Sequence, residues 1–164
     1  MQAAPWWSLQ ELRRGATDGT TLGYWTGPDR TSPQAAFLAV TRDGSAVEST
    51  VVLDGKTRIV WSAAKLQVSE AGSSRLKSLD LEGVQIRDWA VLFHTESRMA
   101  RSTLSFDTKA SAGPLRFLIT GLAPGTWEIW RNGWLVDSNA FVEPREGVLY
   151  YSGNPGSYFL RRIT

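Results

Sequence analysis

Short runs in which apolar and polar residues alternate recur along the chain from about residue 35 onward. Gly, Asp, Asn and Ser gather between these runs, so most runs end at a turn signal. Strands at such close spacing leave little room for helices. The pattern predicts strands within the runs 35–40, 47–53, 57–63, 65–70, 75–81, 84–94, 102–108, 115–120, 126–130, 134–137, 140–143, 147–151 and 157–163.

This succession of short strands predicts an all-β fold, a two-sheet antiparallel β-sandwich of the immunoglobulin-like or jelly-roll-like kind. Three dipeptides, Asp43-Gly44, Asp54-Gly55 and Asn132-Gly133, mark tight hairpins, because Asp, Asn and Gly tolerate the positive φ that a type I′ turn requires. The segment 88–94, DWAVLFH, is apolar on both faces. It therefore predicts a central strand that is covered on both sides.

Residues 125–137, GTWEIWRNGWLVD, concentrate three of the eight tryptophans. In a hairpin with an Asn132-Gly133 turn, strand alternation places two groups of side chains on opposite faces. The first group is predicted to face the core and contains Trp127, Ile129, Trp134 and Val136. The second group is polar except for two members and contains Thr126, Glu128, Trp130, Leu135 and Asp137.

Trp130 is therefore the unusual tryptophan of the three. One interpretation is an exposed platform on which a sugar ring stacks, because an indole offers a flat apolar face and one N–H donor. The alternative is burial beneath the N-terminal segment, since large aromatic side chains are usually buried. That segment carries further aromatic residues, Trp6, Trp7, Tyr24 and Trp25.

The first 33 residues differ in character from the rest. Ser8 and Glu11 have the spacing of a helix capping box, which predicts a short helix over roughly 8–14. A segment rich in Gly, Thr and Pro follows and carries the Tyr24-Trp25 pair. The predicted organisation is an N-terminal arm over 1–33 and a β-sandwich domain over 34–164.

Composition narrows the classes of function. The formal net charge is +2 and no run of five like charges occurs, so nucleic acid is not an expected partner. The chain has no cysteine, which excludes disulfides and thiolate chemistry. No apolar run approaches the ~18 residues of a membrane span. The N-terminal residues have neither the basic start nor the apolar stretch of an intact signal peptide.

Catalytic signals are weak. The single histidine, His94, fits a histidine at a strand end, and no nucleophile, phosphate-binding or zinc motif accompanies it. Glu96 and Glu128 lie near aromatic residues, which leaves a carboxylate pair for glycan cleavage as an alternative. No metal ligand set and no cofactor motif is recognisable. Arg98, Arg101 and Arg131 are candidate contacts for carboxylate or sulfate groups, the alternative being ordinary solvated or ion-paired arginines.

The last fifty residues contain the element LITGLAPGTWEIWRNG and, after a variable piece, EGVLYYSGNPGSYFLRRI. Over about 120–163 this resembles the C-terminal β-sandwich domains of heparinase II/III-like bacterial polysaccharide lyases. The matching positions are Gly121, Leu122, Pro124, Gly125, Trp127, Ile129, Asn132, Gly133, Leu149, Gly153, Gly156, Tyr158 and Leu160. Those lyases carry an α-helical toroid with much of the catalytic apparatus, for which this chain has no room. The resemblance therefore implies an accessory domain and carries over no catalytic residue.

The resulting hypothesis is a non-catalytic β-sandwich domain of an extracytoplasmic bacterial carbohydrate-active protein, periplasmic or secreted, that binds glycan or braces a catalytic domain. Its expected partners are a polysaccharide or an adjacent protein domain. Trp130, Trp25 and Tyr24 would supply stacking, and Arg131 would contact an acidic group. Two alternatives stay open: a structural module that docks through an aromatic face, and a small carboxylate-dependent glycan-degrading enzyme.

Overall fold

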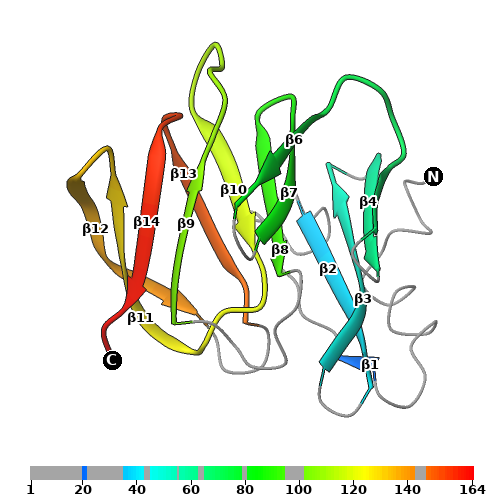
Figure 1. Cartoon of the computed structure of the whole chain (residues 1–164), viewed down its shortest axis with the longest axis horizontal. Helices are drawn as coiled ribbons and strands as arrows, with labels where there is room; N and C mark the ends of the chain where they lie inside the picture. Colours follow the sequence, from blue (N-terminus) through cyan, green and yellow to red (C-terminus); the bar gives the residue numbers. More distant parts are fainter. Residues whose placement is uncertain are drawn as a thin grey trace. The chain divides into compact units, whose positions relative to one another are not determined.

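The structure is a computed structural model that describes residues 20–21, 35–42, 45–54, 56–62, 65–78, 81–94, 102–142 and 147–164. The chain divides into two compact units, residues 1–71 and residues 72–164, which are treated separately below. Every regular element in the described residues is a β-strand (Figure 1). The described residues include no helix that could span a membrane.

The first unit contains one five-stranded antiparallel sheet in the order β1-β2-β3-β4-β5. Consecutive strands pair with one another, as expected for a meander whose turns are short. Alternate side chains of β4 and β5 are buried, among them Ile59, Trp61 and Leu66, whereas β3 is buried at every position from Ser49 to Leu53. The strands are β1 (Thr20–Thr21), β2 (Ala35–Arg42), β3 (Ser45–Leu53), β4 (Thr57–Ser62) and β5 (Lys65–Val68).

The second unit begins with a sheet in the order β13-β10-β8-β7-β6. Its central strand β8 is buried along Trp89 to Phe93, which confirms that the DWAVLFH run is covered on both sides. β8 and β10 run parallel, whereas the other pairs of this sheet are antiparallel. The strands are β6 (Ser74–Lys77), β7 (Leu81–Ile86), β8 (Trp89–His94), β10 (Leu115–Ile119) and β13 (Leu149–Gly153).

The other sheet of this unit has the order β12-β11-β14-β9 and is wholly antiparallel. β11 and β12 form the hairpin around Asn132-Gly133, and β14 lies between β11 and β9. The strands are β9 (Thr103–Asp107), β11 (Gly125–Arg131), β12 (Trp134–Val142) and β14 (Ser157–Arg162).

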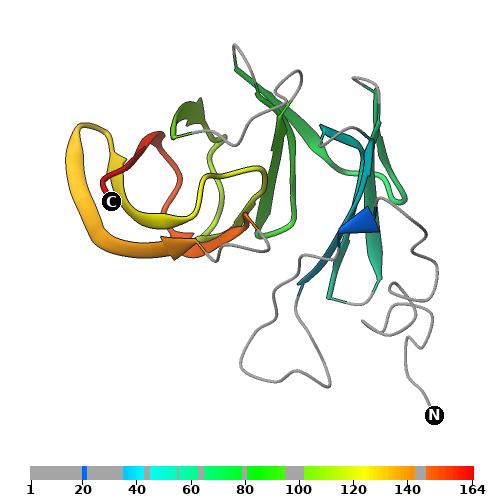
Figure 2. The same ribbon diagram turned by 90° about the horizontal axis from the view of Figure 1, so that it is seen from below.

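One hydrophobic core joins the two sheets of the second unit, whose strands curve around it (Figure 2). Phe117 of β10 contacts Tyr158 of β14 at a centroid distance of 4.9 Å, and Phe106 of β9 stacks on Tyr158 at 5.4 Å. Burial of such aromatic side chains supplies much of the stabilisation of a core. The core includes Leu76, Leu81, Leu92, Leu104, Phe106, Leu115, Phe117, Ile119, Trp127, Ile129, Val142, Leu149, Tyr158 and Leu160.

These two sheets confirm the predicted all-β sandwich. Three features differ from the predicted runs: the run 75–81 is divided between β6 and β7, residues 84–94 split at a turn, Arg87-Asp88, and the runs 134–137 and 140–143 merge into β12. Arg87 has a φ of 53°, a positive value that the first turn residue of a two-residue hairpin requires. Arg rarely adopts such a φ, so the sequence does not predict this turn. The helix predicted over 8–14 and the arm over 1–33, apart from β1, lie outside the described residues and stay predictions.

Candidate functional site

The β11–β12 hairpin positions the candidate site. Asn132 and Gly133 have φ angles of 51° and 83°, which confirms the predicted tight turn. The Asn132 side-chain oxygen accepts a hydrogen bond from the Ser157 N–H at 2.9 Å, and the Asn132 N–H donates to the Ser157 carbonyl at 2.7 Å. These two bonds tie the tip of the hairpin to the first residue of β14.

The three tryptophans of the hairpin have three different environments. Trp127 is fully buried and donates its indole N–H to the Ala123 carbonyl at 2.9 Å. Trp130 is partly buried. Trp134 is 77% exposed, so its assignment to the core is wrong. It stands at the hairpin tip on the edge strand β12, opposite Arg131, where no further strand of its sheet covers it.

The predicted pairing holds near the turn and fails farther away. Arg131 pairs with Trp134 and Trp130 pairs with Leu135, as predicted. Ile129, however, pairs with Asp137 instead of Val136, because β12 contains irregularities on either side of that rung. An extra residue in one strand shifts its register in this way. Val136 still packs against the core.

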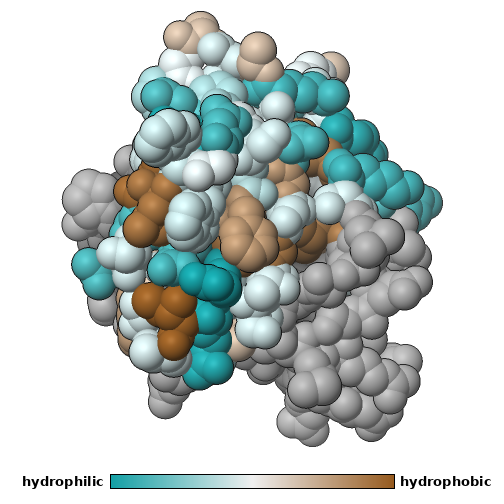
Figure 3. All heavy atoms as spheres, turned by 60° about the vertical axis from the view of Figure 1, so that its left-hand side comes forward, coloured by the Kyte–Doolittle hydropathy of each residue, from teal (hydrophilic) through white to brown (hydrophobic). Residues whose placement is uncertain are grey.

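A row of side chains crosses the outer face of the β12-β11-β14-β9 sheet. Leu135 pairs with Trp130, Trp130 with Phe159, and Phe159 with Ser105, so one rung passes through all four strands. Leu135 is 47% exposed and Phe159 is 39% exposed. We call Leu135, Trp130 and Phe159 the outer-face row. In Figure 3 apolar side chains stand as separate patches among hydrophilic ones.

An ion pair next to the outer-face row holds the Trp130 indole. The Arg161 Nη2 lies 2.7 Å from the Glu128 Oε1, and the Trp130 indole N–H donates to the same oxygen at 3.3 Å. The hydrogen bond from Arg161 lowers the pKa of Glu128, and the bond from Trp130 acts in the same direction while desolvation opposes both. Glu128 is therefore ionised at neutral pH and orients the indole.

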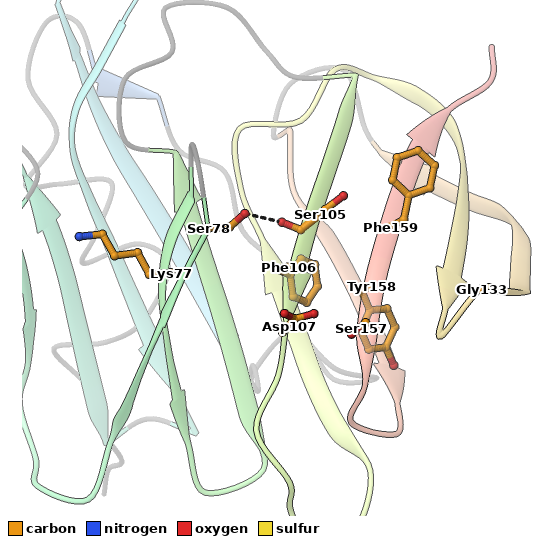
Figure 4. A pocket seen from close by; sticks show the side chains of 9 residues that line it. All are labelled: Lys77, Ser78, Ser105, Phe106, Asp107, Gly133, Ser157, Tyr158 and Phe159. Carbon is orange, nitrogen blue, oxygen red and sulfur yellow. Dashed lines mark hydrogen bonds between the residues drawn. The ribbon is translucent and has the colours of Figure 1, made fainter.

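An open groove of about 360 Å³ adjoins this row (Figure 4). Its outer-face side chains are Phe159 and Ser157 of β14 and Ser105 and Asp107 of β9, and Gly133 borders it at the hairpin tip. Ser78, which follows β6, donates its hydroxyl to the Ser105 carbonyl at 2.8 Å and fixes the far wall. Lys77 and the core residues Phe106 and Tyr158 complete the lining.

Arg131 lies on the opposite side of the sheet from Trp130. It pairs with Tyr158, a core residue whose hydroxyl donates to the Asn154 carbonyl. Burial raises the pKa of the Tyr158 hydroxyl, and the interaction with Arg131 only partly opposes the rise. Arg131 forms no ion pair with any residue that the structure describes. Arg131 and the exposed Trp134 form a second feature, which we call the tip surface.

The structure thus places two of the predicted site residues, Trp130 and Arg131, on different surfaces and does not describe the other two. Trp130 belongs to the outer-face row and Arg131 to the tip surface. Tyr24 and Trp25 lie outside the described residues. The sequence did not single out Phe159, Ser105 and Asp107, because strand alternation marks their faces but not the pairing of β14 with both β11 and β9.

Of the residues considered for catalysis, the described ranges include only His94 and Glu128. His94 ends β8, whereas Glu128 lies on β11 in the other sheet. Glu96, Arg98 and Arg101 lie outside the described ranges. A cluster of three or more metal-ligating side chains does not occur among the residues whose positions are described.

Comparison with known families gives a match to the second unit. The family model of the heparinase II C-terminal domain matches residues 75–162, which is more than half of the 164 residues. The match extends from β6 to β14 and includes both sheets of the second unit. It is longer than the segment 120–163 whose motifs carry the resemblance. A search of curated proteins finds no match.

Proposed function

The chain belongs to the heparinase II C-terminal domain family, and on that basis we propose that it is a non-catalytic accessory domain that binds glycan through the outer-face row. Membership relates it to polysaccharide lyases. Two of the residues considered for catalysis, His94 and Glu128, lie on strands of different sheets.

The observation that carries the proposal is the outer-face row itself. Leu135, Trp130 and Phe159 stand on one rung of three adjacent strands and are all at least partly exposed. The flat rings of Trp130 and Phe159, with the apolar Leu135 in line, suit the C–H faces of successive sugar rings. A single exposed apolar residue needs no explanation, whereas an aligned set beside a groove is typical of a binding surface.

The surroundings of Trp130 favour stacking. Glu128 accepts the indole N–H at 3.3 Å and is itself held by Arg161, so the ring is oriented before a ligand arrives. Pre-organised side chains lose less conformational entropy on binding. The serine hydroxyls and the carboxylate of the adjoining groove offer hydrogen-bond partners to sugar hydroxyls.

Three further parts of the proposal rest on sequence and family. Tyr24 and Trp25 add stacking surface. The domain acts outside the bacterial cytoplasm, in the periplasm or as a secreted protein, because polysaccharide substrates of lyase-related proteins occur there. Its expected partner is a polysaccharide.

The test is a binding assay with a panel of neutral and acidic polysaccharides, using the wild-type protein and a Trp130→Ala variant. We expect saturable binding that falls at least tenfold in Trp130→Ala, as for loss of a contact worth about 1.4 kcal/mol or more. Phe159→Ala is a second variant in the same row, in case Trp130→Ala fails to fold. Trp134→Ala is the matched control outside the row. Equal binding by all four folded proteins, or binding by none, contradicts the proposal.

The tip surface favours a second candidate function, docking to a neighbouring protein domain. Trp134 is 77% exposed and Arg131 has no acidic partner among the described residues. Trp and Arg side chains are enriched among residues that dominate protein interfaces. We propose that Arg131 contacts an acidic group of that partner. If so, Trp134→Ala weakens association with the neighbouring domain and leaves glycan binding unchanged; the reverse pattern contradicts docking at the tip.

A further inference from the structure

The charges around the outer-face row indicate which sugars it accepts. Asp107 lies two residues along β9 from Ser105, on the same face of the sheet, where it pairs with Ser157. Its carboxylate makes no hydrogen bond or ion pair with any residue in the described ranges. Glu128 carries a second negative charge, which Arg161 balances. The unbalanced charge facing a ligand at this groove is therefore negative.

The cations nearest to the groove do not offset that charge. Lys77 lines the groove, but in Figure 4 its ammonium group points away from Ser78 and Ser105. Arg131 lies on the other side of the sheet, at Tyr158. Arg161 is occupied by Glu128. An acidic sugar placed on Phe159 would thus meet the Asp107 carboxylate, whereas the lysine that lines the groove, Lys77, is directed away from Ser105.

The polar groups of the groove are complementary to sugar hydroxyls. A carboxylate is an acceptor with two oxygens and can receive hydrogen bonds from two neighbouring hydroxyls. The hydroxyls of Ser105 and Ser157 both donate and accept. Hydrogen bonds to an ionised acceptor are stronger than those between neutral groups. Asp107 therefore favours a hydroxyl-rich ring and disfavours a ring that carries a carboxylate or a sulfate.

On these grounds we propose that the outer-face row and its groove bind uncharged, hydroxyl-rich sugar chains more tightly than acidic ones. This inference rests on the proposed function. Asp107 is the side chain that accepts hydrogen bonds from the sugar hydroxyls. The rung from Leu135 to Ser105 crosses three strand spacings, about 14 Å. That length exceeds one ring stacked on one side chain. The site consequently takes an oligosaccharide that runs across the strands.

The experiment compares hexasaccharides of matched length by isothermal titration calorimetry: neutral ones of glucose, mannose and galactose, and acidic ones of galacturonate and glucuronate. The wild-type protein should bind a neutral hexasaccharide at least about tenfold more tightly than the acidic ones. That affinity should change little between low and high salt, because no charge pair with the ligand is involved. The matching monosaccharide should bind more weakly.

Two variants test whether the charge of Asp107 causes the preference for neutral sugars. Asp107→Asn keeps the shape of the side chain and removes its charge, so it should weaken neutral binding several-fold and reduce the discrimination against acidic sugars. Lys65→Gln removes an exposed charge that does not line the groove, so it is the matched control and should change neither affinity. Because Asp107 is exposed, its substitution is expected to leave the fold intact, and thermal unfolding checks this.

Each contrary result has its own meaning. Tighter, salt-dependent binding of an acidic hexasaccharide that is lost in Trp130→Ala or in Lys77→Gln overturns the selectivity and leaves glycan binding at the row intact. Unchanged discrimination in folded Asp107→Asn removes Asp107 from its assigned role. Absence of binding by every hexasaccharide and by the longer polysaccharides overturns the proposed function together with this inference.

Discussion

Trp130 and Arg131 are neighbours in the chain, but their side chains lie on opposite faces of the same sheet. Trp130 pairs with Phe159 on the outer face, and Arg131 pairs with Tyr158, which belongs to the core. The alternation of a β-strand imposes this separation. A stacking platform and a cation that look like one site in the sequence are therefore two features, the outer-face row and the tip surface.

The hairpin offers a matched pair of tryptophans for a stability test. Trp127→Ala removes a fully buried ring and its hydrogen bond to Ala123, so we expect a loss of about 3–5 kcal/mol in the free energy of unfolding. Trp134→Ala removes a side chain that is 77% exposed and should change it by less than about 0.5 kcal/mol. Urea unfolding of both variants measures the difference. Equal losses would contradict the assignment of the two environments.

The turn of the hairpin depends on backbone conformation at Gly133. Its φ is 83° and a Cβ added there would meet no atom within 4 Å, so only the backbone opposes a side chain. Gly133→Ala should therefore cost about 1–2 kcal/mol of unfolding free energy. Gly113 is equally open but lacks the left-handed φ. Gly113→Ala, measured in the same thermal unfolding assay, should be neutral or slightly stabilising; a loss as large as that of Gly133→Ala would refute the explanation.

Acid should weaken the contact that orients Trp130. The pKa of Glu128 is lowered chiefly by its hydrogen bond from Arg161, so the folded state binds the proton less readily than the unfolded state. The stabilising contribution is complete above the ordinary glutamate pKa of about 4.3 and is lost as the pH falls through the lowered value. Glu128→Gln removes this contribution. Denaturant midpoints between about pH 2 and pH 6 should converge for the two proteins at the acid end; parallel curves would show that Glu128 is not responsible.

Strand content and the central hairpin were predictable because they depend on local signals. Asn132-Gly133 specifies its turn because both residues tolerate a positive φ. The run that ends at His94 is apolar on both faces of the strand, which predicts a central strand. The turn at Arg87-Asp88 was missed because Arg seldom adopts a φ of 53°. The parallel pairing of β8 with β10 was missed because it joins strands that no hairpin connects.

The candidate site was predictable only in part, because local signals define the face of a strand but not which strands pair. Alternation identifies Trp130 as the aromatic residue on a polar face. It does not reveal that Phe159 stands beside it, since that contact depends on β14 inserting between β11 and β9. Trp134 was assigned to the core because alternation defines a face without telling where along the strand the core ends.

The central claim is that Trp130 contacts sugar, and its indole N–H reports this directly. Two-dimensional ¹H–¹⁵N NMR of the protein should resolve the indole signals of its eight tryptophans, which single substitutions assign. Titration with a neutral hexasaccharide should shift the Trp130 signal saturably and leave that of the buried Trp127 in place. Saturable binding that moves the Trp134 signal and leaves that of Trp130 unchanged would contradict the account.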